Sequence, residues 1–423
     1  MDKLRDGYVL EDLKLYVDNI LAIQNPNLLT GITSRLIYDR LLDRNQQDIN
    51  QELYKKSLMI ANVVTPEMFG AKGDGVTDDT AAWQAMLNTS PKLVNCDPKA
   101  VYITTSKVYS KGEVTINGNG ATYISNKPIT SNAMIQSSIL GAHSKGVTEV
   151  VVANGNLFSV GDRVMIYFGQ DNSDSWYVTN QRNPDQLGIT SQITNILAIN
   201  SNVLTLSNGL DSEVVTGFTS RVQKLYDYKT KINNLRIGLK GTYYDNLNAC
   251  GVEHFKCQFF QAESAPAETT YRDQTSYGTI FNSCTFDERL KVMYGYGAHS
   301  GLTIDCEFKD GVEHDGVWIT YAGPVNCLSI RNKFFRNSRG YYSDTVAGVY
   351  IGAKSRYCKS IDDYVDGLAI GFRVMFGAQD CDITRFIAQH TKATYHAILT
   401  NCQRIKVKDR LFCFWSIQNG RCR

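Results

Sequence analysis

The sequence predicts an all-β protein whose main part is a parallel β-solenoid. Three observations lead to this prediction. Short strand-like segments recur from residue 232 to the C-terminal region, with starts 22 to 31 residues apart. Most of them are followed by a second apolar strand behind a small residue or glycine. Cysteines recur close to the same period. A repeat of 20 to 50 residues that carries short strands is typical of a solenoid with one coil per repeat.

The repeated segments share an alternation of apolar and polar residues, which places one face of each strand inward. They are INNLRI at 232, HFKCQFF at 254, IFNSCTF at 280, LTIDCEF at 302, LSIRNKFF at 328, KSIDDYV at 359, CDITRFI at 381 and QRIKVKD at 403. The second strands are DGVWI at 315, AGVYI at 347, DGLAI at 366 and YHAIL at 395. Residues 227–423 are therefore predicted to form the main coils.

The recurring cysteines predict one ladder of buried thiols. They are Cys257, Cys284, Cys306, Cys358, Cys381 and Cys402. Equivalent positions on successive coils stack about 4.8 Å apart, where Cys serves as a small apolar residue. A metal or heme ladder is the alternative, but it needs His or Cys partners at ligand spacing, which the sequence lacks. The total of 11 Cys is odd and includes no close CxxC pairs, so reduced thiols and no metal or cofactor are expected.

Residues 1–62 are predicted to form a separate α-helical segment. The stretch from Ile32 to Ile60 contains no Gly or Pro and places apolar residues on a four-three spacing. This pattern indicates a helix with one apolar seam. Such a seam serves either a short coiled coil or packing against the body of the protein, and the sequence leaves both open.

Residues 63–143 are predicted to begin the solenoid, and residues 144–226 to form a small antiparallel β module inserted into it. In the second block the strand-like segments VTEVVVAN, GDRVMIYF, ITNILAI and NVLTLS are separated by turn residues such as Asn154-Gly155 and Asn208-Gly209. Short strands joined by such turns are typical of antiparallel hairpins.

The stretch FGAKGDGVTDDTAAWQAML, which begins at Phe69, concentrates glycine and aspartate before a short helical pattern. It lacks the GxxxxGK[ST] of a phosphate loop, the ligand spacing of a calcium loop and the glycine order of a dinucleotide site. A structural role fits better: Gly70, Gly73 and Gly75 form a tight turn, and Thr77 or Asp78 caps a helix that covers the open end of the solenoid.

The longer stretch VTPEMFGAKGDGVTDDTAAWQAML resembles the N-terminal signature of the pectate-lyase-like superfamily, in the form found in bacteriophage tailspikes and tail-borne polysaccharide depolymerases. The resemblance implies a right-handed parallel β-helix that assembles as a homotrimer. It also implies attachment to phage tail or baseplate proteins through the N-terminus, a location in the virion, and action on bacterial surface polysaccharide. The motif that carries the resemblance is not the catalytic one, so no family catalytic residue is carried over.

Composition excludes several other classes of function. The formal net charge is only +2, which gives no broad electrostatic footprint for nucleic acid. The N-terminus has no apolar core of signal-peptide length, and no stretch approaches the roughly 18 apolar residues of a membrane span. We therefore expect synthesis in a host cytoplasm, no export by that route and no membrane insertion.

The candidate site lies in loops that follow strands on successive coils. Glycan hydrolysis requires paired carboxylates, and aromatic rings suit sugar faces. The predicted catalytic residues are Glu288, Glu313, Asp315 and Asp344. The predicted substrate-binding residues are Arg289, Tyr294, His314, Arg339, Tyr341 and Tyr342. Asp315 precedes a glycine, as Asp366 does, so it also fits a plain turn aspartate.

Coil spacing limits the mechanism. Carboxylates one coil apart, such as Glu313 and Asp344, lie roughly 5 Å from each other, the separation of retaining enzymes. Carboxylates two coils apart, such as Glu288 and Asp344, lie roughly 9 to 10 Å from each other, near the upper end of the inverting range.

Four alternatives stay open. Glu263 and Glu268 offer a site between subunits. A lyase would instead use a basic residue, Arg339 or Lys291, to abstract a proton. A spike without catalysis would only bind the glycan or connect other tail proteins. A bacterial pectate-lyase-like enzyme is less favoured, because no secretion signal is present.

Overall fold

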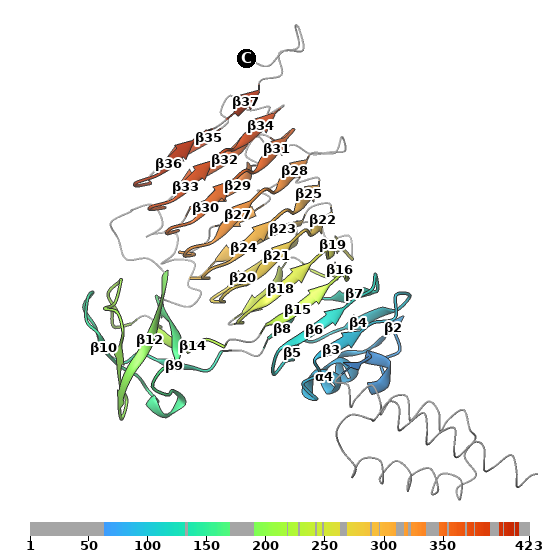
Figure 1. Ribbon diagram of the computed structural model, residues 1–423, viewed down its shortest axis with the longest axis horizontal. Helices are drawn as coiled ribbons and strands as arrows, with labels where there is room; N and C mark the ends of the chain where they lie inside the picture. Colours follow the sequence, from blue (N-terminus) through green and yellow to red (C-terminus); the bar gives the residue numbers. More distant parts are fainter. Residues whose placement is uncertain are drawn as a thin grey trace, which may run out of the picture.

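The computed structural model describes residues 63–131, 134–169, 190–217, 219–226, 229–241, 243–247, 249–262, 269–287, 290–295, 297–309, 317–319, 323–335, 347–352, 355–368, 370–375, 377–389, 397–400, 402–409 and 411–413. They form a long parallel β-solenoid with an antiparallel module beside it (Figure 1). The predicted fold class is confirmed in both parts. The predicted helical segment 1–62 and the alternative carboxylates Glu263 and Glu268 lie outside the described residues.

Three parallel sheets run along the solenoid, and we number them in the order in which a coil visits them. Sheet 1 consists of β1 (Val63–Val64), β3 (Leu93–Asn95), β6 (Val114–Asn117), β15 (Thr230–Asn233), β18 (Val252–Phe255), β21 (Ile280–Asn282), β24 (Leu302–Ile304), β27 (Leu328–Ile330), β30 (Lys359–Ile361), β33 (Asp382–Thr384) and β36 (Lys406–Lys408).

Sheet 2 consists of β2 (Asp74–Asp78), β4 (Val101–Thr104), β7 (Thr122–Ser125), β16 (Arg236–Leu239), β19 (Gln258–Gln261), β22 (Thr285–Phe286), β25 (Glu307–Lys309), β28 (Lys333–Phe335), β31 (Tyr364–Asp366), β34 (Ile387–Gln389) and β37 (Leu411–Cys413). Sheet 3 consists of β17 (Tyr243–Leu247), β20 (Thr269–Gln274), β23 (Leu290–Gly295), β26 (Val317–Ile319), β29 (Ala347–Ile351), β32 (Ile370–Met375) and β35 (Ala397–Thr400). A separate parallel pair joins β5 (Val108–Ser110) to β8 (Ile129–Ser131).

The repeated sequence segments span sheet 1 and sheet 2 together. Each segment contains a sheet 1 strand, a two-residue corner and the start of a sheet 2 strand, as in β18 and β19 around Lys256-Cys257. The first corner residue has a positive φ without being glycine, at Asn234, Lys256, Ser283, Asp305, Arg331, Asp362, Arg385 and Asp409. A left-handed residue turns the chain sharply. The coils from β15 to β35 therefore have three strands each, where the sequence indicated two.

Stacked side chains fill the interior. In sheet 2, Phe259, Phe286, Phe308 and Phe334 occupy successive coils, with ring centroids 4.5 to 5.0 Å apart and interplanar angles of 14° or less. Each of these rings is buried. Identical positions on adjacent parallel strands place identical rings in contact, which extends one core along the solenoid axis.

The cysteines form two stacks rather than the single predicted ladder. In the first stack, the thiols of Cys257, Cys284 and Cys306 lie at the corner between sheets 1 and 2. Each donates a hydrogen bond to a carbonyl oxygen of the preceding coil, with S···O distances of 3.2 to 3.5 Å. Burial raises the pKa of Cys257 and Cys284 well above the usual value, so these thiols serve packing.

The second stack lies at the other end of sheet 1. Cys327, Cys358 and Cys381 directly precede β27, β30 and β33, and their thiols reach carbonyl oxygens of the preceding coil at 3.5 to 3.9 Å. Cys402 belongs to neither stack, because it precedes the bridging residue Gln403. The single-ladder prediction is wrong because both corners of a coil recur with the same period, so the period alone does not separate them.

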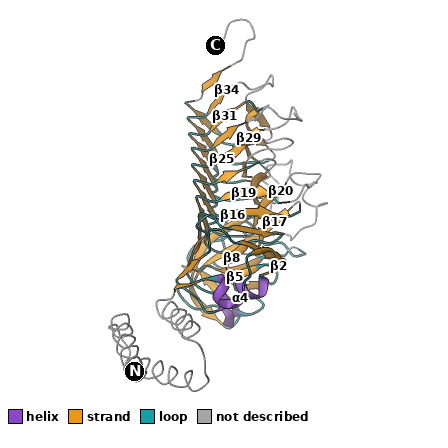
Figure 2. Ribbon diagram, turned by 90° about the vertical axis from the view of Figure 1, so that its right-hand side faces the viewer, coloured by secondary structure: helices purple, strands orange, loops and turns teal. Residues whose placement is uncertain are grey.

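Helix α4 (Thr80–Asn88) lies at the N-terminal end of the solenoid (Figure 2). The indole of Trp83 is fully buried and meets the rings of Tyr102 and Tyr123 edge to face, each at 5.2 Å between centroids. The side chain of Gln84 donates to the carbonyl oxygen of Tyr109 and accepts from its backbone N–H, both at 3.2 Å. The helix therefore covers the end of the hydrophobic core and forms hydrogen bonds with the exposed edge of β5, which protects that edge from pairing with other chains.

The turn before α4 is held by its own aspartates. Asp79 accepts hydrogen bonds from the backbone N–H groups of Lys72 and Gly73 at 2.6 and 3.2 Å. Asp78 accepts from the backbone N–H of Thr80 at 2.9 Å, so Asp78, not Thr77, caps the first turn. A short 3-10 helix, η1 (Pro66–Phe69), precedes the turn.

The remaining features of this stretch are also structural. Asp74 accepts hydrogen bonds from Thr77 and Val76, which lower its pKa to about 2. Gly70, Gly73 and Gly75 all have positive φ, as a tight turn requires. The segment is thus the start of the solenoid and not a site.

The inserted module is a six-stranded antiparallel sheet in the order β10-β13-β12-β11-β14-β9. Its elements are β9 (Gln136–Ser138), β10 (Glu149–Val151), η2 (Gly155–Leu157), β11 (Arg163–Phe168), β12 (Thr190–Asn200), β13 (Val203–Leu206) and β14 (Arg221–Lys224). Since β15 pairs directly with β6, the chain leaves the solenoid and returns to the next coil. The sheet begins at β9, earlier than the predicted boundary at 144.

The module packs against the solenoid near the corner that leads into sheet 1. The guanidinium of Arg163 lies 5.2 Å from the ring centroid of Tyr277, and Tyr277 is 6.2 Å from the ring of His299. Burial, with a smaller contribution from Arg163, lowers the pKa of His299 to about 4. This imidazole is therefore neutral at neutral pH.

Among the described residues, Asp273 and Asp363 are carboxyl groups buried inside the coils, and Asp273 has the larger pKa shift. Its Oδ1 accepts hydrogen bonds from Asn246 Nδ2 and Thr279 Oγ1 at 2.7 and 2.8 Å, while Oδ2 has no hydrogen-bond partner among the described residues. Burial raises the pKa of Asp273 from its usual 3.8 to about 7. Burial also raises the pKa of Asp363 to about 6.

The buried carboxyl of Asp273 predicts that stability falls as the pH rises. Below pH 3.8 the group is protonated in both the folded and the unfolded chain. Above that value the unfolded chain ionises first, so the free energy of unfolding decreases until the pH passes about 7. Between pH 5 and pH 7, we expect the free energy of unfolding to decrease by about 2 kcal/mol more in the wild type than in Asp273→Asn.

Denaturant unfolding of both proteins at the two pH values measures this difference. Asp363 is present in both proteins, so its own titration cancels in the comparison. Equal losses of stability in the wild type and the variant would contradict the prediction.

Candidate functional site

The predicted site loops connect sheet 2 to sheet 3 on consecutive coils. Glu288 and Arg289 lie between β22 and β23. Glu313, His314 and Asp315 lie between β25 and β26. Arg339, Tyr341, Tyr342 and Asp344 lie between β28 and β29. All nine residues are outside the described residues. The flanking strands are direct neighbours in both sheets, so the three connections start and end on adjacent coils.

Tyr294 is the one predicted site residue that the structure describes, and it lies in the core. Its side chain is fully buried on β23, and its hydroxyl lies 2.8 Å from Thr303 Oγ1. Its ring fills the space above Gly301, where an added Cβ would approach ring atoms to 2.4 Å. The substrate-binding role predicted for Tyr294 is therefore corrected, because sheet 3 directs this ring inward. Burial also raises its pKa well above the usual value.

The outer face of sheet 2 borders these connections and carries carboxylates, cations and rings. Asp287 accepts a hydrogen bond from Gln258 Nε2 at 2.5 Å, and its Oδ1 lies 3.9 Å from the ammonium of Lys309. Farther along, the Tyr364 hydroxyl donates to Asp366 Oδ2 at 3.3 Å. The ring of Tyr364 lies 6.1 Å from that of Phe335.

Sequence reasoning missed this face. Strand alternation was the available signal. Lys309, Phe335 and Asp366 occupy the same outward position on β25, β28 and β31, and Asp287 directly follows β22. Asp287 and Asp366 are three coils apart, roughly 14 Å at the interstrand spacing, which is beyond both separations used in glycoside hydrolysis. Asp287 and Asp366 therefore do not form a catalytic pair with each other.

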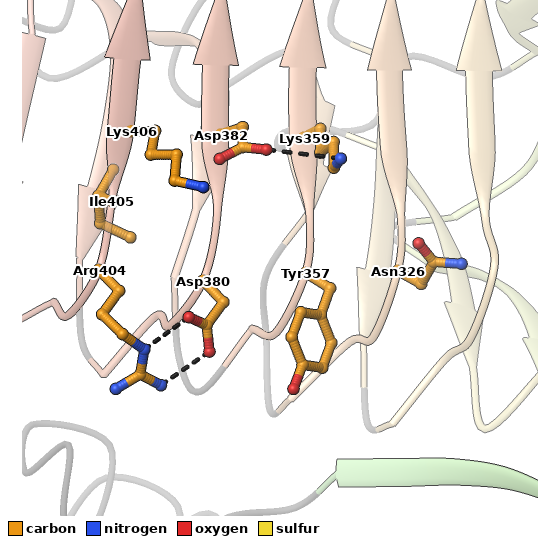
Figure 3. A pocket seen from close by; sticks show the side chains of 8 residues that line it. All are labelled: Asn326, Tyr357, Lys359, Asp380, Asp382, Arg404, Ile405 and Lys406. Atoms are coloured by element: carbon orange, nitrogen blue, oxygen red, sulfur yellow. Dashed lines mark hydrogen bonds and ion pairs between the residues drawn. The ribbon is translucent and has the colours of Figure 1, made fainter.

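A separate pocket lies on sheet 1 near the C-terminal coils. Its volume is about 610 Å³. Eight residues line it: Asn326, Tyr357, Lys359, Asp380, Asp382, Arg404, Ile405 and Lys406. Figure 3 shows Tyr357, Asp380 and Arg404 on successive coils at the corner, with Lys359, Asp382 and Lys406 on the adjoining strands.

Ion pairs order the pocket. Arg404 holds Asp380 through two hydrogen bonds, Nε to Oδ1 at 2.5 Å and Nη2 to Oδ2 at 2.7 Å. These contacts lower the pKa of Asp380. The ammonium of Lys359 lies 3.4 Å from Asp382 Oδ2. The charged groups are thus fixed in place around the exposed ring of Tyr357.

Two further observations concern the described part of the chain. There, no group of three or more His, Cys, Asp and Glu side chains is arranged to hold a metal ion. Its helices include none that is both long and apolar enough to cross a lipid bilayer.

Comparison with known proteins gives one sequence match and several structural ones. No protein-family model matches the chain. A stretch of 46 residues, 11% of this chain, is 50% identical to "Depolymerase 1, capsule K30/K69-specific" of Klebsiella phage K5-2 and spans only 5% of that protein.

Among solved structures, the chain is similar to the tailspike gp61 of Pseudomonas phage phi297, at 10% identity over 84% of this chain and 77% of that one, with a TM-score of 0.38. It is similar to PfbA, a surface adhesin of Streptococcus pneumoniae, at 9% identity over 85% and 80%, with a TM-score of 0.46. It is also similar to the Gp54 tailspike of Acinetobacter baumannii bacteriophage AP22, at 12% identity over 86% and 73%, with a TM-score of 0.33.

Proposed function

We propose that this chain is a phage tail protein that binds and degrades a bacterial surface polysaccharide. The observation that carries the proposal is the 46-residue stretch that is 50% identical to a capsule-specific depolymerase. The solenoid supports it, because its connections between sheets 2 and 3 start and end on adjacent coils, along a stack of strands long enough for a polymer. The carboxylates and rings on the outer face of sheet 2 are the groups that sugar recognition uses.

For the reaction we propose glycoside hydrolysis by a carboxylate pair from the connections between sheets 2 and 3. Glu313 and Asp344 belong to adjacent coils, and Glu288 and Asp344 are two coils apart. Asp315 is a further candidate. Arg289, His314, Arg339, Tyr341 and Tyr342 would hold the sugar beside the pair. No metal or cofactor takes part in this scheme.

A polysaccharide lyase is the alternative reaction. Of its two candidate bases, Lys291 is buried on β23, with 7% of its surface exposed, and it contacts other groups of the protein. Arg339 is then the remaining candidate. A lyase leaves an unsaturated product that absorbs in the near ultraviolet, whereas a hydrolase does not.

The second candidate function is glycan binding without cleavage. The pocket at Tyr357 favours it, because it combines an exposed ring with fixed charged groups on a surface away from the proposed cleavage loops.

Incubation of the purified full chain with capsular and lipopolysaccharide glycans tests the proposal. We expect new reducing ends from at least one acidic or neutral polymer, without an increase in near-ultraviolet absorbance. An increase in absorbance would show that the chain is a polysaccharide lyase and not a hydrolase. If no polymer of the panel is shortened, the binding function replaces the enzymatic one.

We further propose that the chain forms a homotrimer and joins phage tail or baseplate proteins through residues 1–62, in the virion. Light scattering of the full chain is expected to give about three times the monomer mass of 47.3 kDa. A stable monomer at micromolar concentration would contradict this assembly.

A further inference from the structure

The pocket on sheet 1 contains an exposed aromatic ring at a corner where the backbone has a positive φ. Tyr357 has φ of +56°, and 53% of its surface is exposed. Positive φ is costly for a bulky residue, and the equivalent corner positions hold Ser300, Asn326, Asp380 and Arg404. Burial in the core does not explain a ring at this position. The positive φ belongs to the corner itself, whereas the exposed ring is particular to Tyr357 among these positions.

The neighbouring coils surround this ring with polar groups. Asn326, Tyr357, Asp380 and Arg404 occupy the same corner on four successive coils, in a row of roughly 14 Å at the interstrand spacing. The solvent-facing row therefore consists, from one coil to the next, of an amide, an aromatic ring, a carboxylate and a guanidinium. A flat ring with flanking donors and acceptors is the arrangement that binds the face and the hydroxyl groups of a sugar.

The charge of the pocket favours an anionic ligand. Its lining holds three cationic side chains and two carboxylates. Arg404 pairs with Asp380, and Lys359 pairs with Asp382. Lys406 is the register neighbour of Asp382 on β36, and among the described residues it has no carboxylate within 4.0 Å. Its charge contributes to the lowered pKa of Asp380, but without a direct ion pair its ammonium can contact a carboxylate on the ligand.

The backbone around Tyr357 is fixed on both sides. The N–H of Tyr357 donates to the carbonyl oxygen of Gln379, and the N–H of Arg356 donates to that of Pro324. The Arg356 side chain also reaches Ser212 Oγ of the inserted module at 3.4 Å. A site held in this way loses little conformational entropy when it binds a ligand.

We infer that this pocket is a second glycan-binding site, which stacks a carboxylated sugar of the polymer on Tyr357 and pairs the sugar carboxylate with Lys406. The site lies at the corner between sheets 3 and 1, whereas the proposed cleavage loops connect sheets 2 and 3. It would hold the polymer while another part is cut. The identity of the polymer as a polysaccharide rests on the proposed function.

Affinity electrophoresis of the full chain tests the inference, with alginate, polygalacturonate or hyaluronan in the gel and dextran as the neutral control. We expect at least one uronate polymer, and not dextran, to retard the wild type. Tyr357→Ala and Lys406→Gln should each weaken the apparent affinity about tenfold, the effect of losing one strong contact to a charged or stacked ligand.

Two matched variants control for general effects. Tyr357→Phe keeps the ring, and Lys408→Gln removes the same charge from the same strand outside the pocket. Both should bind as the wild type does. Absence of retardation by all three uronate polymers, or unchanged binding by both Tyr357→Ala and Lys406→Gln, would overturn the inference. Binding that depends on Tyr357 without any release of reducing ends would instead contradict the cleavage proposal and leave this site standing.

Discussion

Replacement of Glu313 by glutamine, or of Asp344 by asparagine, is expected to lower the rate of reducing-end release by roughly 10² to 10⁴-fold. The physical reason is that glycoside hydrolysis needs one carboxyl group to protonate the leaving oxygen and a second to attack or to activate water. Each variant keeps the size of the side chain and removes its ability to exchange a proton. The measurement is the initial rate on a polymer that the wild type shortens.

Two further variants identify the second member of the pair. If Glu288→Gln is impaired and Glu313→Gln is not, the pair spans two coils and the anomeric configuration of the first product should be inverted. If Glu313→Gln is impaired, the configuration should be retained. Asp315→Asn is expected to stay near the wild-type rate if Asp315 only forms a turn.

Glu307→Gln provides the matched control. Glu307 begins β25 on the same coil as Glu313 but lies on the outer face of sheet 2. Its replacement should leave the rate within about twofold of the wild type, since it belongs to no proposed pair. Wild-type rates in all four carboxylate variants would exclude the proposed loops as the catalytic site. Unchanged melting temperatures would show that any loss of rate is not a loss of folding.

Trp83→Ala is expected to lower the free energy of unfolding by about 3 to 5 kcal/mol. The fully buried indole fills the space between Tyr102 and Tyr123 at the first coils. Its removal leaves a cavity under α4 and weakens the helix that pairs with the edge of β5. Denaturant unfolding measures the loss, and limited proteolysis should cut the variant first near its N-terminal coils.

Trp83→Phe separates the role of the ring from that of the indole N–H. The Trp83 Nε1 atom has no hydrogen-bond partner among the described residues. Replacement by phenylalanine therefore removes no hydrogen bond, and the free energy of unfolding should decrease by less than about 1.5 kcal/mol. A loss of less than about 1 kcal/mol in Trp83→Ala would show that α4 does not close the core.

The sequence indicated the solenoid because sheet 1 strands repeat an alternating pattern that only a repeated coil explains. It did not separate sheet 2 from sheet 1, because the corner between them also uses residues such as Lys256 and Arg331 at positive φ, and these residue types carry no turn signature. Side chains at this corner pair between adjacent coils. Arg331 Nε lies 2.8 Å from Asp305 Oδ1, and the two residues are 26 positions apart in the chain, so no local pattern indicates the contact.

The candidate site was predictable only in part. The side chains Asp287 and Asp366 follow from strand alternation once the three sheets are known. Tyr294 was misplaced because the whole stretch DERLKVMYGYG after Phe286 was assigned to a loop, whereas β23 extends through Gly295 and buries the ring. The pocket at Tyr357 gave no local signal, since its lining comes from four separate coils and is assembled only by the stacking of the corners.

The constant two-residue corner between sheets 1 and 2 has a consequence for variation among relatives of this chain. The connections on the opposite side differ widely in extent, from 367–369 after β31 to 336–346 after β28, while the corner keeps its length on every coil from β15 onward. Insertion or exchange of a segment between sheets 2 and 3 therefore leaves the register of all three sheets intact. For a protein of the proposed function, recombination of such short segments would change the host range of a phage without a new scaffold.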